Sequence, residues 1–194
     1  GMVMERSNRR LDALVHQDAL TGCLNRAGLL TYKTAAKGPA AVLVADLDHF
    51  KLLNDRYGHA AGDEALREFV RRAKSILPKS GIIARSGGEE FVIILPGEGE
   101  GGQTAWRLCE VIGGKPVNWA GEVLSMTVSV GVSSVRENEA FREAILRADE
   151  ALYRAKEAGR NQVKLFGDGS GGTKPPGAPS AGLAKQPALR SIAS

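Results

Sequence analysis

The sequence predicts an α/β fold in which a mixed β-sheet is flanked by helices. Short runs of β-branched and other apolar residues alternate along the chain with longer segments whose apolar residues recur at helical spacing. Two of the short runs are joined by a segment containing Gly-Gly, which predicts a hairpin within this alternating order. Apolar residues make up 43% of the 194 residues and charged residues 25%, which suits one ordinary folded domain.

The predicted elements begin with a short N-terminal helix over residues 3–17, whose apolar residues follow three- and four-residue spacing. This helix either caps the domain or continues from an upstream domain. Residues 40–46 (AAVLVAD) form a β-rich apolar run and predict a buried strand. Residues 62–77 predict a helix, and residues 82–85 and 91–95 predict the two strands of the hairpin.

The second half of the folded region continues the alternation. A helix is predicted around residues 101–112, and residues 126–135 alternate polar and apolar side chains as a strand does. Residues 138–158 predict the last long helix, and residues 162–166 predict a closing strand.

Three regions follow from this pattern: an N-terminal linker helix (1–17), one folded domain (18–166) and a C-terminal tail (167–194). The tail is rich in glycine, proline and serine and has no apolar period, so it cannot bury enough surface to offset the entropy of ordering it. We expect the tail to be disordered.

The composition also bears on cellular location. No apolar stretch approaches the roughly 18 residues needed to cross a bilayer, and no signal-peptide pattern opens the chain. The two cysteines, Cys23 and Cys109, cannot build a disulfide framework or a CxxC zinc site. We therefore expect a cytoplasmic setting and no membrane contact in this fragment.

The formal net charge of +4 raises the question of a nucleic-acid partner. The tail accounts for +2 and the N-terminal segment for +1, which leaves +1 for residues 18–166. The basic residues thus lie mostly outside the predicted domain, and no aromatic stacking array accompanies them. We expect no nucleic-acid partner.

Two acidic residues follow the first predicted strand directly. In an extended backbone Asp46 and Asp48 share one face, so both carboxylates could approach one hard cation. A solvated turn is the alternative, and a DxD sequence by itself favours that alternative.

A second cluster lies at the predicted hairpin tip, where Gly87 and Gly88 suit a two-residue turn that requires positive φ. A turn does not explain Glu89 and Glu90, since two consecutive glutamates are disfavoured at the start of a strand. A cation or a metal-bound phosphate would neutralise them. Glycines without Cβ atoms would also let a nucleotide approach closely.

Two further sets of polar residues have simple structural explanations. Asn54 and Asp63 could each cap a helix, and for Asp63 a helical pattern follows. Lys156 and Arg160, four residues apart, would share one face near the end of the last helix. There they could complement the helix dipole or bind polyphosphate. Lone His59 lies in no spacing that supports zinc.

The combination of these motifs resembles the GGDEF family, the diguanylate cyclases. The matching stretches are DALTGCLNRAGL (18–29), DLDHFKLLNDRYGHAAGDEAL (46–66), ARSGGEEFVIILP (84–96) and ADEALYRAKEAGRNQV (148–163). The resemblance covers about residues 18–166, and the family's palm-like, nucleotidyl-cyclase-like sheet agrees with the predicted elements.

The resemblance implies an enzyme that condenses two GTP molecules into cyclic di-GMP and two pyrophosphates, with Mg²⁺ or Mn²⁺ as cofactor. Glu89 occupies the position of the base for the attacking 3′-hydroxyl, and Lys51 that of the transition-state-stabilising lysine. The implied metal ligands are Asp46, the carbonyl of Leu47, Glu89 and, with lower rank because strand alternation turns it away from Glu89, Glu90. The implied substrate-binding residues are Phe50, Asn54, His59, Asp63, Gly87, Gly88, Lys156 and Arg160.

Asn54 and Asp63 match the guanine-reading positions of the family. A carboxylate can accept from guanine N1–H and the N2 amine, which adenine lacks, so we expect GTP to be preferred over ATP. Many family members also carry an RxxD product-inhibition motif before the glycines. Its Arg and Asp positions are Pro78 and Gly81 here, so we expect no product inhibition through that site.

Each domain of this family binds one GTP, so the resemblance implies that a homodimer brings two active sites face to face. It also implies an upstream sensor or receiver domain outside this chain. The alternative function is a non-catalytic, GTP-binding regulatory module that signals through its N-terminal helix.

Overall fold

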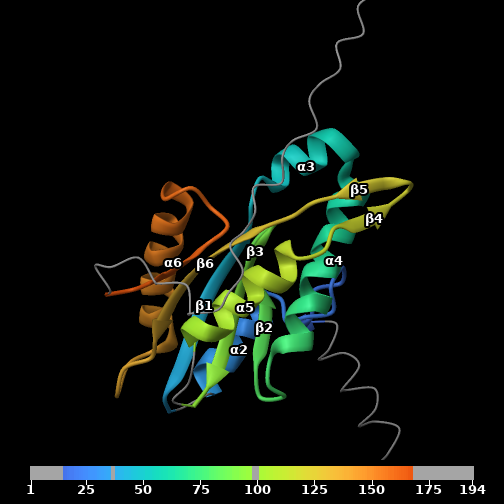
Figure 1. The fold of residues 1–194 in the computed structure, drawn as a ribbon. Helices are drawn as coiled ribbons and strands as arrows, with labels where there is room; N and C mark the ends of the chain where they lie inside the picture. Colours follow the sequence, from blue (N-terminus) through green and yellow to red (C-terminus); the bar gives the residue numbers. More distant parts are fainter. Residues whose placement is uncertain (1–14, 36–37, 98–100, 168–194) are drawn as a thin grey trace, which may run out of the picture.

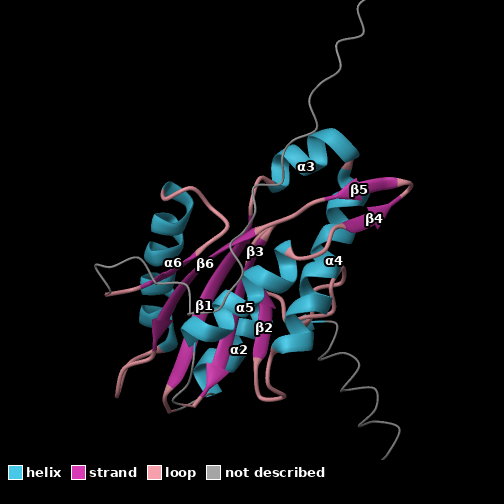
Figure 2. Cartoon of the chain, in the orientation of Figure 1, coloured by secondary structure: helices cyan, strands magenta, loops and turns pink. Residues whose placement is uncertain are grey.

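The computed structural model describes residues 15–35, 38–97 and 101–167, which form a central sheet with helices on both faces (Figures 1 and 2). In spatial order the sheet strands are β2 (Ile82–Arg85), β3 (Glu90–Pro96), β1 (Ala40–Leu47), β6 (Val128–Ser134) and β7 (Val163–Leu165). β1 pairs antiparallel with β3 and β6, β2 pairs antiparallel with β3, and β7 pairs parallel with β6. The predicted mixed sheet flanked by helices is confirmed.

Five helices lie in the described part of the chain, together with a separate two-stranded ribbon. The helices are α2 (Arg26–Ala35), α3 (Phe50–Tyr57), α4 (His59–Ile76), α5 (Gly101–Gly113) and α6 (Phe141–Glu157). The ribbon pairs β4 (Val117–Trp119) with β5 (Glu122–Leu124) and contacts α4, beyond one end of the sheet (Figure 1). None of these helices is long and apolar enough to cross a membrane.

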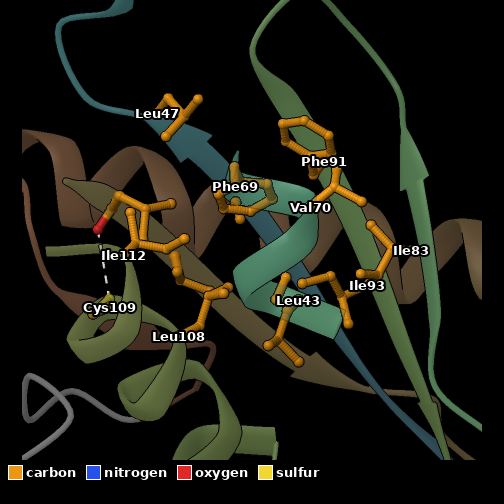
Figure 3. Close-up of a cluster of buried hydrophobic side chains, with 14 of the residues drawn as sticks. Leu43, Leu47, Phe69, Val70, Ile83, Phe91, Ile93, Leu108, Cys109 and Ile112 are labelled. Carbon is orange, nitrogen blue, oxygen red and sulfur yellow. Dashed lines mark hydrogen bonds between the residues drawn. The ribbon is translucent and has the colours of Figure 1, made fainter. Parts of the chain in front are cut away.

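Strand alternation gives the sheet two different buried faces. Odd-numbered residues of β1 and β3, such as Leu43 and Ile93, contact α4 and α5 in the larger apolar cluster (Figure 3). Even-numbered residues, such as Val42 and Ile94, contact α2 and α6 in the smaller cluster. The layers are therefore α2 with α6, the sheet, and α4 with α5.

The structure confirms every predicted strand and long helix that it describes, with ends shifted by a few residues. It adds α2, α3, β4 and β5, which the sequence did not predict. The predicted N-terminal helix lies outside the described residues except at its end, where Val15 and His16 are helical and Gln17 instead forms a β-bridge with Leu24. The predicted tail also lies outside them, apart from Gly167.

Candidate active site

The predicted site residues gather at one end of the sheet, where β1 ends, β3 begins and α6 ends (Figure 1). The helix α3 follows β1 by two residues and lies beyond this end of the sheet. Segments far apart in the sequence therefore meet at one place, the loop end of a buried central strand.

Asp46 and two consecutive glutamates lie where the end of β1 adjoins the start of β3. Asp46 is registered opposite Glu90, so both side chains lie on the face that α6 covers. The backbone N–H of Leu47 donates to the carbonyl oxygen of Glu89 at 3.3 Å, which ties the end of β1 to the residue before β3. The sequence ranked Glu90 below Glu89, yet Glu90 is the one directly across from Asp46.

Lys156, near the end of α6, supplies a positive charge to this cluster. Its Nζ lies 3.0 Å from Oδ2 of Asp46, and the two side chains are 34% and 14% exposed. Burial raises the pKa of Asp46; Lys156 opposes that shift, while the charges of Glu89 and Glu90 add to it. The cluster therefore favours binding of additional positive charge.

The turn between β2 and β3 spans four residues rather than two, and neither Gly87 nor Gly88 has a positive φ. The explanation of these glycines by a two-residue turn is therefore wrong. A Cβ on Gly88 would meet no heavy atom within 4 Å, so the space over the turn is open. Open space over a backbone without side chains is what the close approach of a ligand requires.

Arg85 supports this turn, and the sequence analysis missed it. Its Nε and Nη2 donate to the carbonyl oxygen of Gly88 at 3.0 and 2.7 Å, and its Nη1 donates to Asp18 at 3.2 and 3.3 Å. Burial raises the pKa of Asp18, but hydrogen bonds from Thr21 and the Arg85 charge together lower it further. The sequence gave no signal for this, because Asp18 and Arg85 are 67 positions apart.

Asn54 carries the one buried side-chain oxygen or nitrogen in the described part of the chain that has no hydrogen-bond partner, its Oδ1. This amide lies against Gly62, where a Cβ would come within 1.8 Å of Oδ1. A buried acceptor without a donor is costly unless a ligand satisfies it. Asp63 follows Gly62 in α4, which begins at His59, so the prediction that Asp63 caps this helix is wrong.

The loop between β1 and α3 exposes polar groups beside the carboxylates. The backbone of His49 adopts the left-handed conformation, with φ 55°, which is uncommon for a residue other than glycine. Lys51 on α3 and His59 at the start of α4 are exposed, and Phe50 is half-buried. Lys51 and His59 are therefore accessible to a solute, whereas Phe50 packs partly against the core.

Arg160 does not share a helical face with Lys156. The helix α6 ends at Glu157, and Arg160 lies in the following turn with φ 65°. Both cations still border the same end of the sheet, but two different backbone segments place them. The prediction of a common helical face is wrong.

Asp48 shares the α6 face with Asp46, as the alternating pattern predicted, but it is not open to a cation. Both of its oxygens accept hydrogen bonds from Thr127, Ser129 and Asn161. Among the residues the structure describes, no three His, Cys, Asp or Glu side chains converge as a ready metal cage. Mg²⁺ needs fewer, since it commonly uses one or two carboxylates plus substrate phosphates, so Asp46 and its acidic neighbours fit that ion.

Comparison with known proteins identifies the family of the chain. The family model "Diguanylate cyclase, GGDEF domain" matches residues 15–162. The chain is 41% identical over 157 residues to diguanylate cyclase DgcP of Pseudomonas aeruginosa, covering 76% of this chain and 23% of that protein. It is 39% identical over 171 residues to diguanylate cyclase DgcM of Escherichia coli, covering 82% and 40%.

A solved structure gives the same result for the fold. The diguanylate cyclase SiaD of Pseudomonas aeruginosa, in complex with its activator SiaC, superposes with a TM-score of 0.76 at 32% identity. The match covers 84% of this chain and 66% of that one. The chain spans less than half the length of DgcP and DgcM, so what those proteins do as a whole is a separate question.

Proposed function

Because the chain belongs to the GGDEF family of diguanylate cyclase domains, we propose that it condenses two GTP molecules into cyclic di-GMP and two pyrophosphates. The observation that carries the proposal is the position of Asp46 at one end of the sheet, directly opposite Glu90 and in contact with Lys156, with Glu89 immediately before Glu90 in the chain. Carboxylates with a neighbouring cation at the loop end of a buried strand suit phosphoryl transfer from a metal-bound nucleotide.

In each of the two bond-forming steps, the 3′-oxygen of one GTP attacks the α-phosphorus of the other. A P–O3′ bond forms, the bond from the α-phosphorus to the bridging oxygen breaks, and pyrophosphate leaves. Glu89 accepts the proton of the attacking hydroxyl. The exposed Lys51 and the pair Lys156 and Arg160 offset the negative charge on the triphosphate.

Asp46, the carbonyl oxygen of Leu47 and Glu89, with Glu90 alongside, would hold Mg²⁺ or Mn²⁺. When bound, the metal polarises the α-phosphate and lowers the pKa of the attacking hydroxyl. Lys156 now contacts Asp46 and would turn to the phosphates once a metal takes the carboxylate. The raised pKa of Asp46, caused first by burial, supports this exchange, because the carboxylate gains from any added positive charge.

Guanine would bind between α3 and α4. The unpartnered Oδ1 of Asn54 can accept from a base amine, and Asp63, half-buried on α4, can accept from N1–H and the N2 amine of guanine. Adenine offers neither N1–H nor the N2 amine, so it would leave these acceptors unpaired. We therefore propose GTP rather than ATP as the substrate, with Phe50, His59, Gly87 and Gly88 bordering the nucleotide.

One domain presents one such site, so we propose that two copies meet face to face to join two GTP molecules. We further propose a cytoplasmic signalling protein in which an additional domain regulates this one. The short fraction of DgcP and DgcM that the chain spans is consistent with an additional domain.

The test is to incubate the protein with GTP and Mg²⁺ and to measure cyclic dinucleotide and pyrophosphate by chromatography. We expect Glu89→Gln to reduce turnover by at least about a hundredfold, because the amide cannot take the proton. The matched control is Glu137→Gln, an exposed glutamate in the turn after β6. Near-normal turnover by Glu89→Gln would contradict the assigned role, and GTP binding without product in the unchanged protein would favour the regulatory module.

A further inference from the structure

The carboxylate of Asp48 is buried and fully used by the protein itself. The side chain is 8% exposed and lies one residue past the end of β1. Its Oδ1 accepts from the hydroxyl of Ser129 at 2.6 Å, and its Oδ2 accepts from the hydroxyl of Thr127 at 2.7 Å and the backbone N–H of Asn161 at 3.0 Å. The two nearby carboxylates thus have different surroundings, since Asp46 contacts Lys156 and Asp48 contacts only neutral donors.

These donors belong to separate segments of the chain. Ser129 is in β6, and Thr127 directly precedes that strand. The Asp48 backbone N–H also donates to the carbonyl oxygen of Thr127 at 2.9 Å, so the β1–α3 loop is joined to the start of β6. Asn161 lies in the turn between α6 and β7, 113 positions away from Asp48.

That turn has a backbone that needs an external restraint. Gly159, Arg160 and Asn161 have φ values of 111°, 65° and 47°, three left-handed residues in succession. The left-handed conformation is unfavourable for a residue other than glycine, so the surrounding structure must hold it. The hydrogen bond from the Asn161 N–H to Asp48 ties this turn to the end of β1.

The hydrogen bond between Asn161 and Asp48 joins the two backbone segments that carry the neighbouring cations. Arg160 is adjacent to Asn161 on one side of the bond, and on the other side the loop after Asp48 leads directly to Lys51. We propose that Asp48 is a positioning residue. By accepting a hydrogen bond from the α6–β7 turn, it fixes Arg160 relative to the β1–α3 loop that leads to Lys51. The role of Arg160 toward polyphosphate rests on the proposed function, whereas the tie itself does not.

We expect Asp48→Asn to keep the hydrogen bonds of this side chain and Asp48→Ala to remove them, so the two variants together test the proposal. In Asp48→Asn the amide oxygen can accept from Thr127 and Asn161, and the amide N–H can donate to the Ser129 hydroxyl oxygen. In Asp48→Ala no acceptor remains. The tie is measured first, by amide hydrogen exchange without nucleotide. We expect faster exchange at Asn161 in Asp48→Ala, protection restored in Asp48→Asn, and unchanged exchange in the core of β1 and β3.

The effect on substrate is measured next as KM and kcat for GTP. We expect Asp48→Ala to raise KM about tenfold with a smaller change in kcat, because a displaced cation weakens phosphate binding. In an Arg160→Ala background Asp48→Ala should have no further effect on KM. Ser129→Ala, which removes one bond on the β6 side, should lower the melting temperature and leave KM unchanged.

The outcomes separate this proposal from the proposed function. Unaltered exchange at Asn161 in Asp48→Ala, or an Asp48→Asn variant as impaired as Asp48→Ala, would overturn the positioning role. Independent, multiplying effects of Asp48→Ala and Arg160→Ala on KM would also overturn it. If Asp48→Ala fails to fold, exchange at Asn161 is compared between Asp48→Asn and Asp48→Ser, whose shorter side chain cannot span all three donors. Failure of the unchanged protein to make cyclic dinucleotide would contradict the proposed function alone.

Discussion

Helices α4 and α5 cover one face of the sheet with large apolar side chains, whereas α6 covers the other by close backbone contact. On the first face the rings of Phe69 and Phe91 stack with their centroids 4.3 Å apart (Figure 3). On the second, a Cβ on Gly131 would lie 1.9 Å from the carbonyl oxygen of Ala148 and 2.2 Å from the nitrogen of Leu152. The first face stabilises the domain by burying apolar surface. The second face places Lys156 beside Asp46.

The largest expected effect comes from the first face. Phe69→Ala should lower the free energy of unfolding by about 3–5 kcal/mol, because it leaves a cavity beneath a fully buried ring. Urea unfolding measures this, with Leu52→Ala on the exposed surface of α3 as the control. The folded fraction should keep its KM for GTP. A raised KM would mean that the cavity also displaces Asp63, which α4 carries to the proposed guanine site.

Gly131→Ala should act on the second face. The added methyl must push α6 away from β6, at a cost of about 1–3 kcal/mol. Unlike Phe69→Ala, this variant should also raise KM for GTP, because α6 carries Lys156 to Asp46. The matched control on the same strand is Ser134→Ala at an exposed position. A loss of stability with unchanged KM would contradict the claim that the packing of α6 on β6 positions Lys156 for GTP.

The smallest expected effect concerns acid. Arg147 lowers the pKa of Glu139, which lies in the segment between β6 and α6, to about 2. Because the folded pKa lies below the ordinary value of 4.5, this pair stabilises the protein fully above about pH 5 and progressively less toward pH 2. Glu139→Gln should therefore cost about 1 kcal/mol at pH 7 and much less at pH 3, measured by urea unfolding. The exposed Glu137→Gln is the control, and an equal loss at both pH values would contradict the assignment.

Long periodic segments were predictable from the sequence because burial imposes a period on them. The central strands β1, β3 and β6 are buried on both faces and form continuous apolar runs, whereas α5 and α6 each bury one face. The helix α3 spans only eight residues and has no fully buried residue, and β4 and β5 have three residues each, too few to show alternation. These elements are set by tertiary context.

The site residues also fall into two groups, those that the sequence predicted and those that it could not. Asp46, Glu89 and Lys156 could be proposed from motifs whose chemistry is local in the sequence. The roles of Arg85 and Asp48 could not, because their partners lie 67 to 113 positions away. The φ values of Arg160 and Asn161 were also hidden, since the sequence placed the end of the last helix near residue 158 but carried no signal for two left-handed residues after it.

The bond between Asp48 and Asn161 also bears on the order in which the domain is made. During synthesis Asp48 leaves the ribosome 113 residues ahead of its partner, which corresponds to roughly 6–23 s at ordinary rates of translation. By then the segments that form the α4 and α5 face, including β1, β3 and β6, have all been synthesised. The nascent chain can therefore bury most of its larger apolar cluster before the proposed nucleotide site is complete, and Asn161 and Val163 join the domain only as its last strand arrives.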